Sequence, residues 1–451
     1  MNKKVVVIGG GFAGLSCAYY LNKAGFDVVI LEREDQLGGL ARGIKFDGWH
    51  WSLEKAVHHL FSNDSDIIRF AKDTGFFKNL FFKRPLTGYL YKINGKIRIY
   101  TLDSSLSFLF FPLLDLLSKF RGGLSLLLLR FSPHFSWFKK VVSIKFIKKT
   151  MGEKVYVMLW KPLFRKKFGK YAGKVVLSFF WARITKRTAK LGYFKGGFQS
   201  FIDYLAKKLS GSGVLILTKT EVSAVNKKQN YFSIEYKKNG KSKTIVADYV
   251  VCALQAPIFL KLTEAILPEE YKLKLRSIKY LNAVSLILET DKPIVNDYYW
   301  LNNAVADFDF TVFIQHTNYI SQNHYGGKHL AYVGWYCDFK DPIWQFNSGS
   351  QVLAHIEPYL KEINPNFDKS KARTALFKAV FAQPIFDKKF AELNLSYKTP
   401  IERLYFAGFE LSFPYDRGTN YAVKVGVETA KHIIQSVFSY NKDKSISSKS
   451  K

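Results

Sequence analysis

The stretch that decides the fold stands at the start of the chain, in the run Val5-Val6-Val7-Ile8-Gly9-Gly10-Gly11-Phe12-Ala13-Gly14. After a helix-like segment comes a second apolar run that ends in an acid, Val28-Val29-Ile30-Leu31-Glu32. This order predicts a strand, a glycine turn, a helix and a second strand, which together form a βαβ unit. In such a unit Gly9 permits the tight turn, Gly11 lets a phosphate approach the backbone, and Gly14 lets the helix pack closely on the strand.

Glu32 strengthens this interpretation. It follows Gly14 by 18 residues, close to the ~20 expected of the acid that binds a ribose hydroxyl. The N-terminus of the intervening helix would present free N–H groups and a positive dipole end to a pyrophosphate. The alternative is a glycine-rich turn in an unrelated α/β core. We therefore predict a dinucleotide site, but this stretch does not choose the dinucleotide.

Size and composition narrow the class of protein. The chain has 451 residues, of which 48% are hydrophobic and 23% charged, as expected of a folded protein of about two to three domains. Its three cysteines lie far apart and form no Cys-x-x-Cys pair, so we expect a reducing compartment and no disulfide framework. No Cys/His cluster indicates a metal, and no Gly-x-Ser-x-Gly or P-loop motif supports a hydrolase or kinase.

Basic charge is concentrated in one part of the chain. Residues 139–190 hold sixteen Lys and Arg residues and one acid, Glu153. Such a local field favours an anionic partner: a membrane surface, a nucleic acid or an acidic substrate. We do not expect nucleic acid, because the chain carries no motif that reads DNA or RNA.

Apolar runs precede the basic block. The segment 104–131 is rich in Leu and Phe, but its runs are shorter than a membrane-spanning helix and are interrupted by charges. Apolar segments beside a Lys/Arg cluster and tryptophans are typical of a protein that lies on a membrane. We therefore expect an anionic membrane surface to be bound through 104–190. An ordinary helical domain with a charged outer surface is the alternative.

Several motifs in order along the chain resemble the FAD-dependent amine oxidase, protoporphyrinogen oxidase and phytoene desaturase superfamily. They are the Gly9–Gly14 loop, Glu32, Gly38-Gly39…Arg42, Gly192-Tyr193…Gly196-Gly197-Phe198, and Phe406-Ala407-Gly408…Arg417-Gly418-Thr419-Asn420-Tyr421-Ala422. The run Trp181…Arg183…Arg187 before Gly192 is most similar to the protoporphyrinogen-oxidase-like branch.

The resemblance implies an α/β fold built around a discontinuous, Rossmann-like FAD-binding domain. We expect this domain to comprise residues 1–60, 191–257 and 400–438. An inserted α+β substrate-binding domain would occupy 258–399, and a helical, basic and apolar region 61–190. The polar tail 439–451 is expected to be disordered.

The resemblance also implies where FAD lies. The glycine loop would meet the pyrophosphate, and Glu32 the adenosine ribose. Val222 would hold the adenine through its backbone, Glu410 would lie near the ribityl chain, and the helix beginning near Asn420 would point at the flavin. The full set of expected FAD contacts is Gly9, Gly11, Phe12, Ala13, Gly14, Glu32, Arg33, Gly39, Leu40, Arg42, Val222, Gly408, Glu410, Arg417, Asn420 and Ala422.

We therefore expect an FAD-dependent oxidoreductase: an oxidase, dehydrogenase or desaturase that moves a hydride from a large apolar substrate to the flavin N5. Tetrapyrroles, polyenes and isoprenoids are the expected classes of substrate. We expect a cytoplasmic enzyme, peripheral on the inner face of the cell membrane. Two alternatives stay open: a non-redox flavin mutase that resembles UDP-galactopyranose mutase, and a flavin-free binding protein of the GDI type.

The catalytic residues are not determined by the sequence. Acid/base candidates are His50, His58 and His59, which follow the first FAD motifs, and His316, at the end of an apolar run. Tyr415 and Arg417 precede the last helix and are further candidates for facing the flavin ring. A structural role is the alternative for each histidine.

Overall fold

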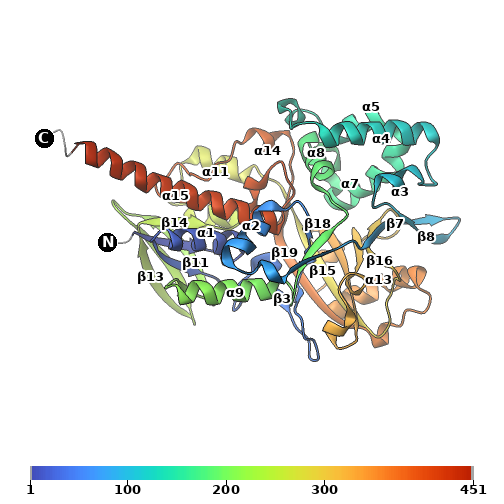
Figure 1. Ribbon diagram of the computed structural model, residues 1–451, viewed down its shortest axis with the longest axis horizontal. Helices are drawn as coiled ribbons and strands as arrows, with labels where there is room; N and C mark the ends of the chain where they lie inside the picture. Colours follow the sequence, from blue (N-terminus) through green and yellow to red (C-terminus); the bar gives the residue numbers. More distant parts are fainter. Residues whose placement is uncertain (1–2, 448–451) are drawn as a thin grey trace.

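A five-stranded parallel sheet forms the centre of the first domain (Figure 1) in the computed structural model, which describes residues 3–447. Its strand order is β10–β2–β1–β14–β20. The strands are β1 (Lys4–Ile8), β2 (Asp27–Leu31), β10 (Leu215–Leu217), β14 (Tyr249–Cys252) and β20 (Leu404–Phe406). They are rich in Val and Ile, and β1 and β14 are buried almost throughout, as expected where both faces of a parallel sheet are covered.

Helices from three distant parts of the chain pack around this sheet (Figure 1). They are α1 (Phe12–Lys23), α9 (Phe198–Gly211) and α15 (Thr419–Ser447). Gly426 lets α15 approach α1, because a Cβ at this position would lie 2.1 Å from the carbonyl oxygen of Ala13. A three-stranded antiparallel sheet completes the domain, with β11 (Thr220–Lys227), β12 (Phe232–Lys238) and β13 (Lys241–Ala247). The predicted discontinuous α/β domain is confirmed.

The second domain is built on a seven-stranded sheet in the order β19–β15–β18–β17–β16–β7–β8. The strands are β7 (Leu86–Ile93), β8 (Lys96–Thr101), β15 (Tyr280–Thr290), β16 (Tyr298–Asn303), β17 (Val312–Gln315), β18 (His329–Cys337) and β19 (Arg373–Pro384). Helices α12 (Pro342–Gln345) and α13 (Gly349–Ile363) accompany it. β7 and β8 come from the segment 61–190, which was expected to be helical. They form a hairpin at Asn94-Gly95, where both residues have positive φ, as a type I′ hairpin turn requires.

Short elements connect the two domains. They are β3 (Gly43–Ile44), β4 (Leu53–Glu54), β5 (Leu60–Phe61), α2 (Ser65–Thr74), β6 (Leu80–Lys83), β9 (Leu191–Phe194), α10 (Ala256–Thr263), α11 (Glu269–Arg276) and α14 (Lys388–Glu392).

From Ser105 to Lys186 the segment 61–190 is mainly helical, as expected, and forms a bundle that lies above the second sheet in the view of Figure 1. Its helices are α3 (Ser105–Leu109), α4 (Leu116–Phe131), α5 (Ser143–Met151), α6 (Glu153–Val155), α7 (Lys161–Phe168) and α8 (Leu177–Lys186). Among the helices of residues 3–447, none combines the length and the apolar character needed to cross a membrane.

The C-terminal end differs from the prediction. A disordered tail was expected over 439–451, but α15 continues to Ser447. The tail from Tyr440 contains neither Pro nor Gly, and a polar composition does not stop a helix that is already nucleated. Positions 448–451 lie outside the described residues.

Candidate functional site

Two glycines of the loop between β1 and α1 have different roles: Gly14 is needed for packing, and Gly11 is open to a ligand. A Cβ at Gly14 would lie 1.9 Å from the carbonyl oxygen of Gly9, so only glycine fits there. At Gly11 the nearest atom to such a Cβ is the Cα of Gly39, at 3.8 Å. The N-terminus of α1 has no side-chain cap. The loop therefore leaves open space and free N–H groups where a phosphate is expected.

A second glycine segment, Gly38-Gly39, packs against the glycine loop. The Gly38 N–H donates to the carbonyl of Gly10 at 2.9 Å, which holds Gly39 against Gly11. Gly39 begins the short 3₁₀ helix η1 (Gly39–Ala41), which also contains Leu40. The two segments predicted to contact the same cofactor are thus brought together.

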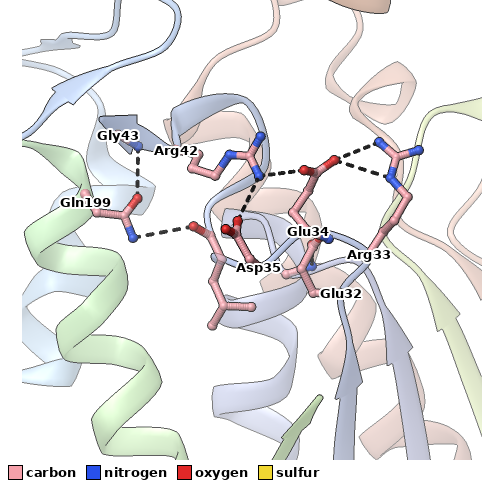
Figure 2. Close-up of polar contacts among 9 residues, drawn as sticks. Glu32, Arg33, Glu34, Asp35, Arg42, Gly43 and Gln199 are labelled. Atoms are coloured by element: carbon pink, nitrogen blue, oxygen red, sulfur yellow. Dashed lines mark hydrogen bonds and ion pairs between the residues drawn. The ribbon is translucent and has the colours of Figure 1, made fainter. Parts of the chain in front are cut away.

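Acidic and basic side chains surround this cradle (Figure 2). Glu32 ends next to the loop, where its carboxylate accepts from the N–H of Gly10 at 2.7 Å and of Glu34 at 2.9 Å. Glu34 pairs with Arg42, with Oε2 and Nη1 2.8 Å apart, and with the exposed Arg33, with Oε1 and Nη2 3.0 Å apart. The hydrogen bond from Arg42 holds the pKa of Glu34 below its usual value. The buried Nε of Arg42 has no partner within the described part of the chain, and so remains a donor for a ligand.

β11 brings Val222 to the same end of the sheet. The Thr220 N–H, two residues earlier, donates to the carbonyl of Glu32 at 2.8 Å. The pairing of β11 with β12 shifts register between Val222 and Ala224. Such an irregularity leaves backbone groups out of the ladder, as holding a base through the backbone requires.

The segment after β20 contributes a buried acid. Oε1 of Glu410 accepts from the N–H of Ala256 at 2.8 Å and from the hydroxyl of Tyr280 at 2.5 Å. Its Oε2 has no partner among residues 3–447 and lies against Gly408. Burial raises the pKa of Glu410. A buried, unsatisfied acceptor of this kind suits the hydroxyl groups of a sugar or ribityl chain.

The last helix begins against the first. The Ser16 hydroxyl donates to the carbonyl of Val423 at 3.3 Å, so the N-terminus of α15, which includes Ala422, lies near that of α1. The side chain of Asn420 faces α2 instead: its Oδ1 accepts from the N–H groups of Asp66 at 2.9 Å and Ile67 at 3.1 Å. Phe12 is likewise used in the core, where its ring packs on Phe198 and Phe201. Asn420 and Phe12 therefore have only backbone groups left to offer a cofactor.

The candidate histidines have different surroundings. His50 is exposed, whereas His58 and His59 are half-buried. His58 Nδ1 lies 2.6 Å from the carbonyl oxygen of Ala56, and His59 Nδ1 lies 3.1 Å from the Tyr299 hydroxyl. Burial lowers the pKa of His58 to about 4 and of His59 to about 3. Both rings are therefore neutral at pH 7.

His316 lies in a cluster of tyrosines. It is only 1% exposed, its Nε2 lies 2.9 Å from the Tyr325 hydroxyl, and its ring packs on Tyr193 and Tyr332. Burial lowers its pKa to about 3. These contacts suit a packing residue better than an acid or base.

Sequence reasoning missed Glu54. This residue is fully buried, and its carboxylate accepts from the Phe198 N–H at 2.7 Å and from the Tyr193 hydroxyl at 2.8 Å. Burial raises its pKa to about 7. The available signal was an acid that directly follows an apolar residue in Trp51-Ser52-Leu53-Glu54.

A cluster around Asp416 was also missed. Lys167 and Arg183 both pair with its Oδ2, the latter at 2.9 Å, and Arg417 donates to the Tyr336 hydroxyl at 3.0 Å. Arg417, which was expected to contact FAD, contacts the second domain through this bond and keeps its buried Nε without a partner among residues 3–447. No local pattern could have predicted this cluster, because its members come from distant parts of the chain.

The profile of the family described as flavin containing amine oxidoreductase matches residues 12–434. The chain belongs to this family. It is an FAD-dependent oxidoreductase. The residues above fit FAD: the open glycine loop suits a pyrophosphate, and the free atoms of Arg42 and Glu410 supply a donor and an acceptor.

Solved structures and curated relatives agree with this membership. A protein described as a protoporphyrinogen oxidase from Exiguobacterium sp. 255-15 has the same fold, with a TM-score of 0.73, 15% identity, and coverage of 97% of this chain and 99% of that one. Cyclohexylamine oxidase from Brevibacterium oxydans IH-35A gives a TM-score of 0.72 and 13% identity, with coverage of 97% and 100%. Carotenoid 3,4-desaturase from Haloarcula japonica is 49% identical over 49 residues. That match spans 11% of this chain and 10% of the desaturase.

Proposed function

We propose that this flavoenzyme oxidises a large apolar substrate, such as a tetrapyrrole, polyene or isoprenoid, while it lies on a membrane. The observation that supports the proposal is an exposed apolar face on the helical bundle. Its side chains are those of Leu106, Leu109, Phe110, Leu116, Leu117, Phe120, Leu124, Leu127, Leu128, Phe131, Phe135 and Trp137. We call this set the α4 face.

The α4 face is unusual in its degree of exposure. Leu116 is 81% exposed, Phe131 78% and Phe120 69%. Side chains of this size scattered singly over a surface need no explanation, but a contiguous group marks a site of interaction. Helix α4 buries Gly122, Ser125 and Leu129 against the bundle. Two of these three buried residues are small, whereas most of the large apolar residues of α4 face outward, the reverse of a helix in a water-exposed bundle.

Positive charge accompanies the α4 face. Arg121 on α4 and Lys145 and Lys149 on α5 are exposed, and Lys140 lies beside Trp137. Each exposed Lys or Arg near an anionic bilayer contributes about 1 kcal/mol of attraction. Apolar side chains together with cations match an anionic lipid surface, whereas a second copy of this cationic chain would be repelled.

The chemistry within the enzyme would depend on the neutral histidines. The bound flavin supplies the acceptor for a hydride from the substrate. Because a carbonyl oxygen only accepts, His58 Nδ1 must donate to Ala56, which leaves Nε2 as a proton acceptor. The aromatic rings of Phe61, Tyr299 and Trp300 surround His59 and would exclude water from an apolar substrate.

Anaerobic mixing of the purified protein with candidate substrates tests the reaction. We expect bleaching of the oxidised flavin spectrum by a porphyrinogen, polyene or polyprenol, and none by UDP-sugars. Turnover of a UDP-sugar only after prior reduction of the flavin, with no electron acceptor consumed, would replace this proposal with the mutase. A protein that folds but takes up no FAD would favour the flavin-free binding protein.

Flotation with phosphatidylglycerol vesicles tests the membrane surface. Replacing Leu117, Phe120, Leu124 and Phe131 with Gln should abolish flotation, while Leu273→Gln, also at an exposed Leu, should leave it unchanged. Equal flotation of all variants would contradict the proposal. So would a dimer in solution that dissociates when the α4 face is changed, because the face would then bind a second copy.

A further inference from the structure

Four cations from three parts of the chain gather between the helical bundle and the start of α15. Lys167 is in α7, Arg183 in α8, Arg187 directly follows α8, and Arg417 precedes α15. We call these four residues the cation cluster. Asp416 is its one acidic partner among the described ion pairs, contacted by Lys167 and Arg183 through the same oxygen.

The charges of the cluster do not balance. Four cations and one carboxylate leave three positive charges, and Arg187 pairs with no acid within residues 3–447. Burial and the charge of Arg183 lower the pKa of Arg187. Burial would raise the pKa of Tyr336, but the charges of Arg417 and Lys167 outweigh it and hold that pKa below its usual value. Grouping like charges in a partly buried place is unfavourable unless an anion joins them.

The cluster lies within electrostatic reach of the segment that follows the first FAD motifs. Its charges reach the candidate histidines, because Arg187 contributes to the lowered pKa of His59 and Arg417 to that of His58. Arg187 and Arg183 also act on the pKa of the buried Tyr89 in β7. Arg187 nevertheless keeps exposed surface. A side chain that stays accessible while its charge acts on half-buried neighbours is available to a ligand.

We propose that Lys167, Arg183, Arg187 and Arg417 bind the phosphate or diphosphate head group of the substrate and so place its apolar part beside the flavin. This inference deepens the proposed function and rests on it. Arg183, Arg187 and Arg417 provide planar pairs of N–H donors, which match phosphate oxygens. The buried Nε of Arg417 has no partner in the described chain and adds a further donor.

The charge of the cluster favours a diphosphate over a carboxylate. A single carboxylate would leave two of the three excess charges unbalanced, whereas a diphosphate ester carries two to three negative charges near pH 7.

The bundle connects the cluster to the α4 face: Arg130 on α4 donates to the carbonyl groups of Ile184 at 3.2 Å and Arg187 at 3.4 Å. An amphipathic phosphate ester drawn from the membrane would meet both features.

Calorimetric titration of the FAD-loaded full chain with inorganic pyrophosphate tests the site, since bound FAD already fills the cofactor's own pyrophosphate position. Arg183→Gln and Arg187→Gln should each weaken binding about ten- to hundredfold, the usual effect of losing a charge-assisted hydrogen bond. Arg187→Lys should retain most of the affinity. Arg98→Gln removes the same charge from exposed β8 and should change little. Flavin absorbance and thermal melting verify that each variant is folded and loaded.

Several outcomes would contradict the proposed phosphate-binding site. They are the absence of pyrophosphate binding, equal affinity in wild type and both Gln variants, or an equal loss in Arg98→Gln. If Arg187→Gln also abolished vesicle flotation, the arginines would bind lipid head groups, and the site as proposed would be wrong. Loss of pyrophosphate binding in the variants, together with no bleaching of the wild-type flavin by any apolar substrate, would retain the anion site and refute the proposed oxidation.

Discussion

At the scale of single residues, Gly14 and Gly11 of the first loop have different roles. Gly14 is required by the protein itself, since a Cβ at this position would collide with the Gly9 carbonyl oxygen. Gly11 has an ordinary φ of −78° and open space around it, so the folded chain does not need glycine there. Only a ligand explains why this position should stay free of a side chain.

Substitutions at these two positions should therefore separate folding from binding. Gly14→Ala should lower the free energy of unfolding by about 2 kcal/mol or more, because α1 must shift to admit the methyl group. Gly11→Ala should leave the unfolding of flavin-free protein within about 0.5 kcal/mol of wild type but reduce FAD affinity. Urea denaturation and flavin titration measure the two effects. Full FAD affinity in Gly11→Ala would show that the pyrophosphate lies elsewhere.

Glu54 predicts a dependence of stability on pH. Burial raises its pKa from 4.5 to about 7, so the folded chain binds this proton more tightly than the unfolded chain. Its contribution to stability is therefore largest below about pH 4.5 and is lost as pH rises to about 7, a change of about 3 kcal/mol. Glu54→Gln removes this titration but keeps the shape. The difference in unfolding free energy between Glu54→Gln and wild type should grow in favour of Gln from pH 5 to pH 8. Parallel curves for the two proteins would contradict the prediction.

At the scale of elements, the N-termini of α1, α2 and α15 determine how the cofactor site is assembled. The N-terminus of α1 is uncapped, whereas the backbone N–H groups at the start of α2 are bound by the side chain of Asn420, at the start of α15. The start of α1 is thus left for a ligand, whereas the start of α2 is capped by the Asn420 side chain of α15. This contact fixes the start of α15 against α2.

Replacing Asn420 with Ala tests whether its side chain binds α2 rather than FAD. The loss of two hydrogen bonds at a helix N-terminus should destabilise the protein by about 1 kcal/mol. FAD affinity should change little, because the side chain is directed at α2 and only the backbone of α15 remains for the flavin. Denaturation and flavin titration of the same preparation give both values. Lost FAD binding at unchanged stability would restore Asn420 as a side-chain ligand of the cofactor.

At the scale of the whole molecule, the expected FAD contacts come from the N-terminal, middle and C-terminal parts of the chain. The Thr220 N–H donates to the Glu32 carbonyl, and the Ser16 hydroxyl donates to the Val423 carbonyl. A ligand that contacts all these parts stabilises the folded state of the entire first domain by linkage.

Removal of FAD should therefore lower the melting temperature, and its return should restore it. FAD at a hundred times its dissociation constant is expected to add about 2.7 kcal/mol to the free energy of unfolding. FMN lacks the adenosine half and cannot reach Glu32 or Val222, so it should restore less. Differential scanning fluorimetry of flavin-stripped protein measures this, and equal rescue by FMN and FAD would contradict the placement of the adenosine.

Much of the first domain was predictable because its information is local. The βαβ unit and Glu32 lie within the first 32 residues, and alternation, glycine spacing and burial on both faces act over that range. The hairpin at Asn94-Gly95 was missed although its turn signal was present, because the surrounding apolar residues had been interpreted as helical. The extension of α15 to Ser447 was missed because polar composition was interpreted as disorder.

The sequence by itself determined that this chain has a dinucleotide-binding domain of the FAD type and a region that is both apolar and basic. Only the tertiary structure decided which side chains meet. Arg183 and Asp416 are 233 positions apart, and Tyr193 and Glu54 are 139 apart. Contacts of this kind depend on how sheets and helices pack, and no periodicity along the chain records them. The tertiary structure likewise decided which apolar side chains stay exposed on α4, because burial is a property of neighbours in space.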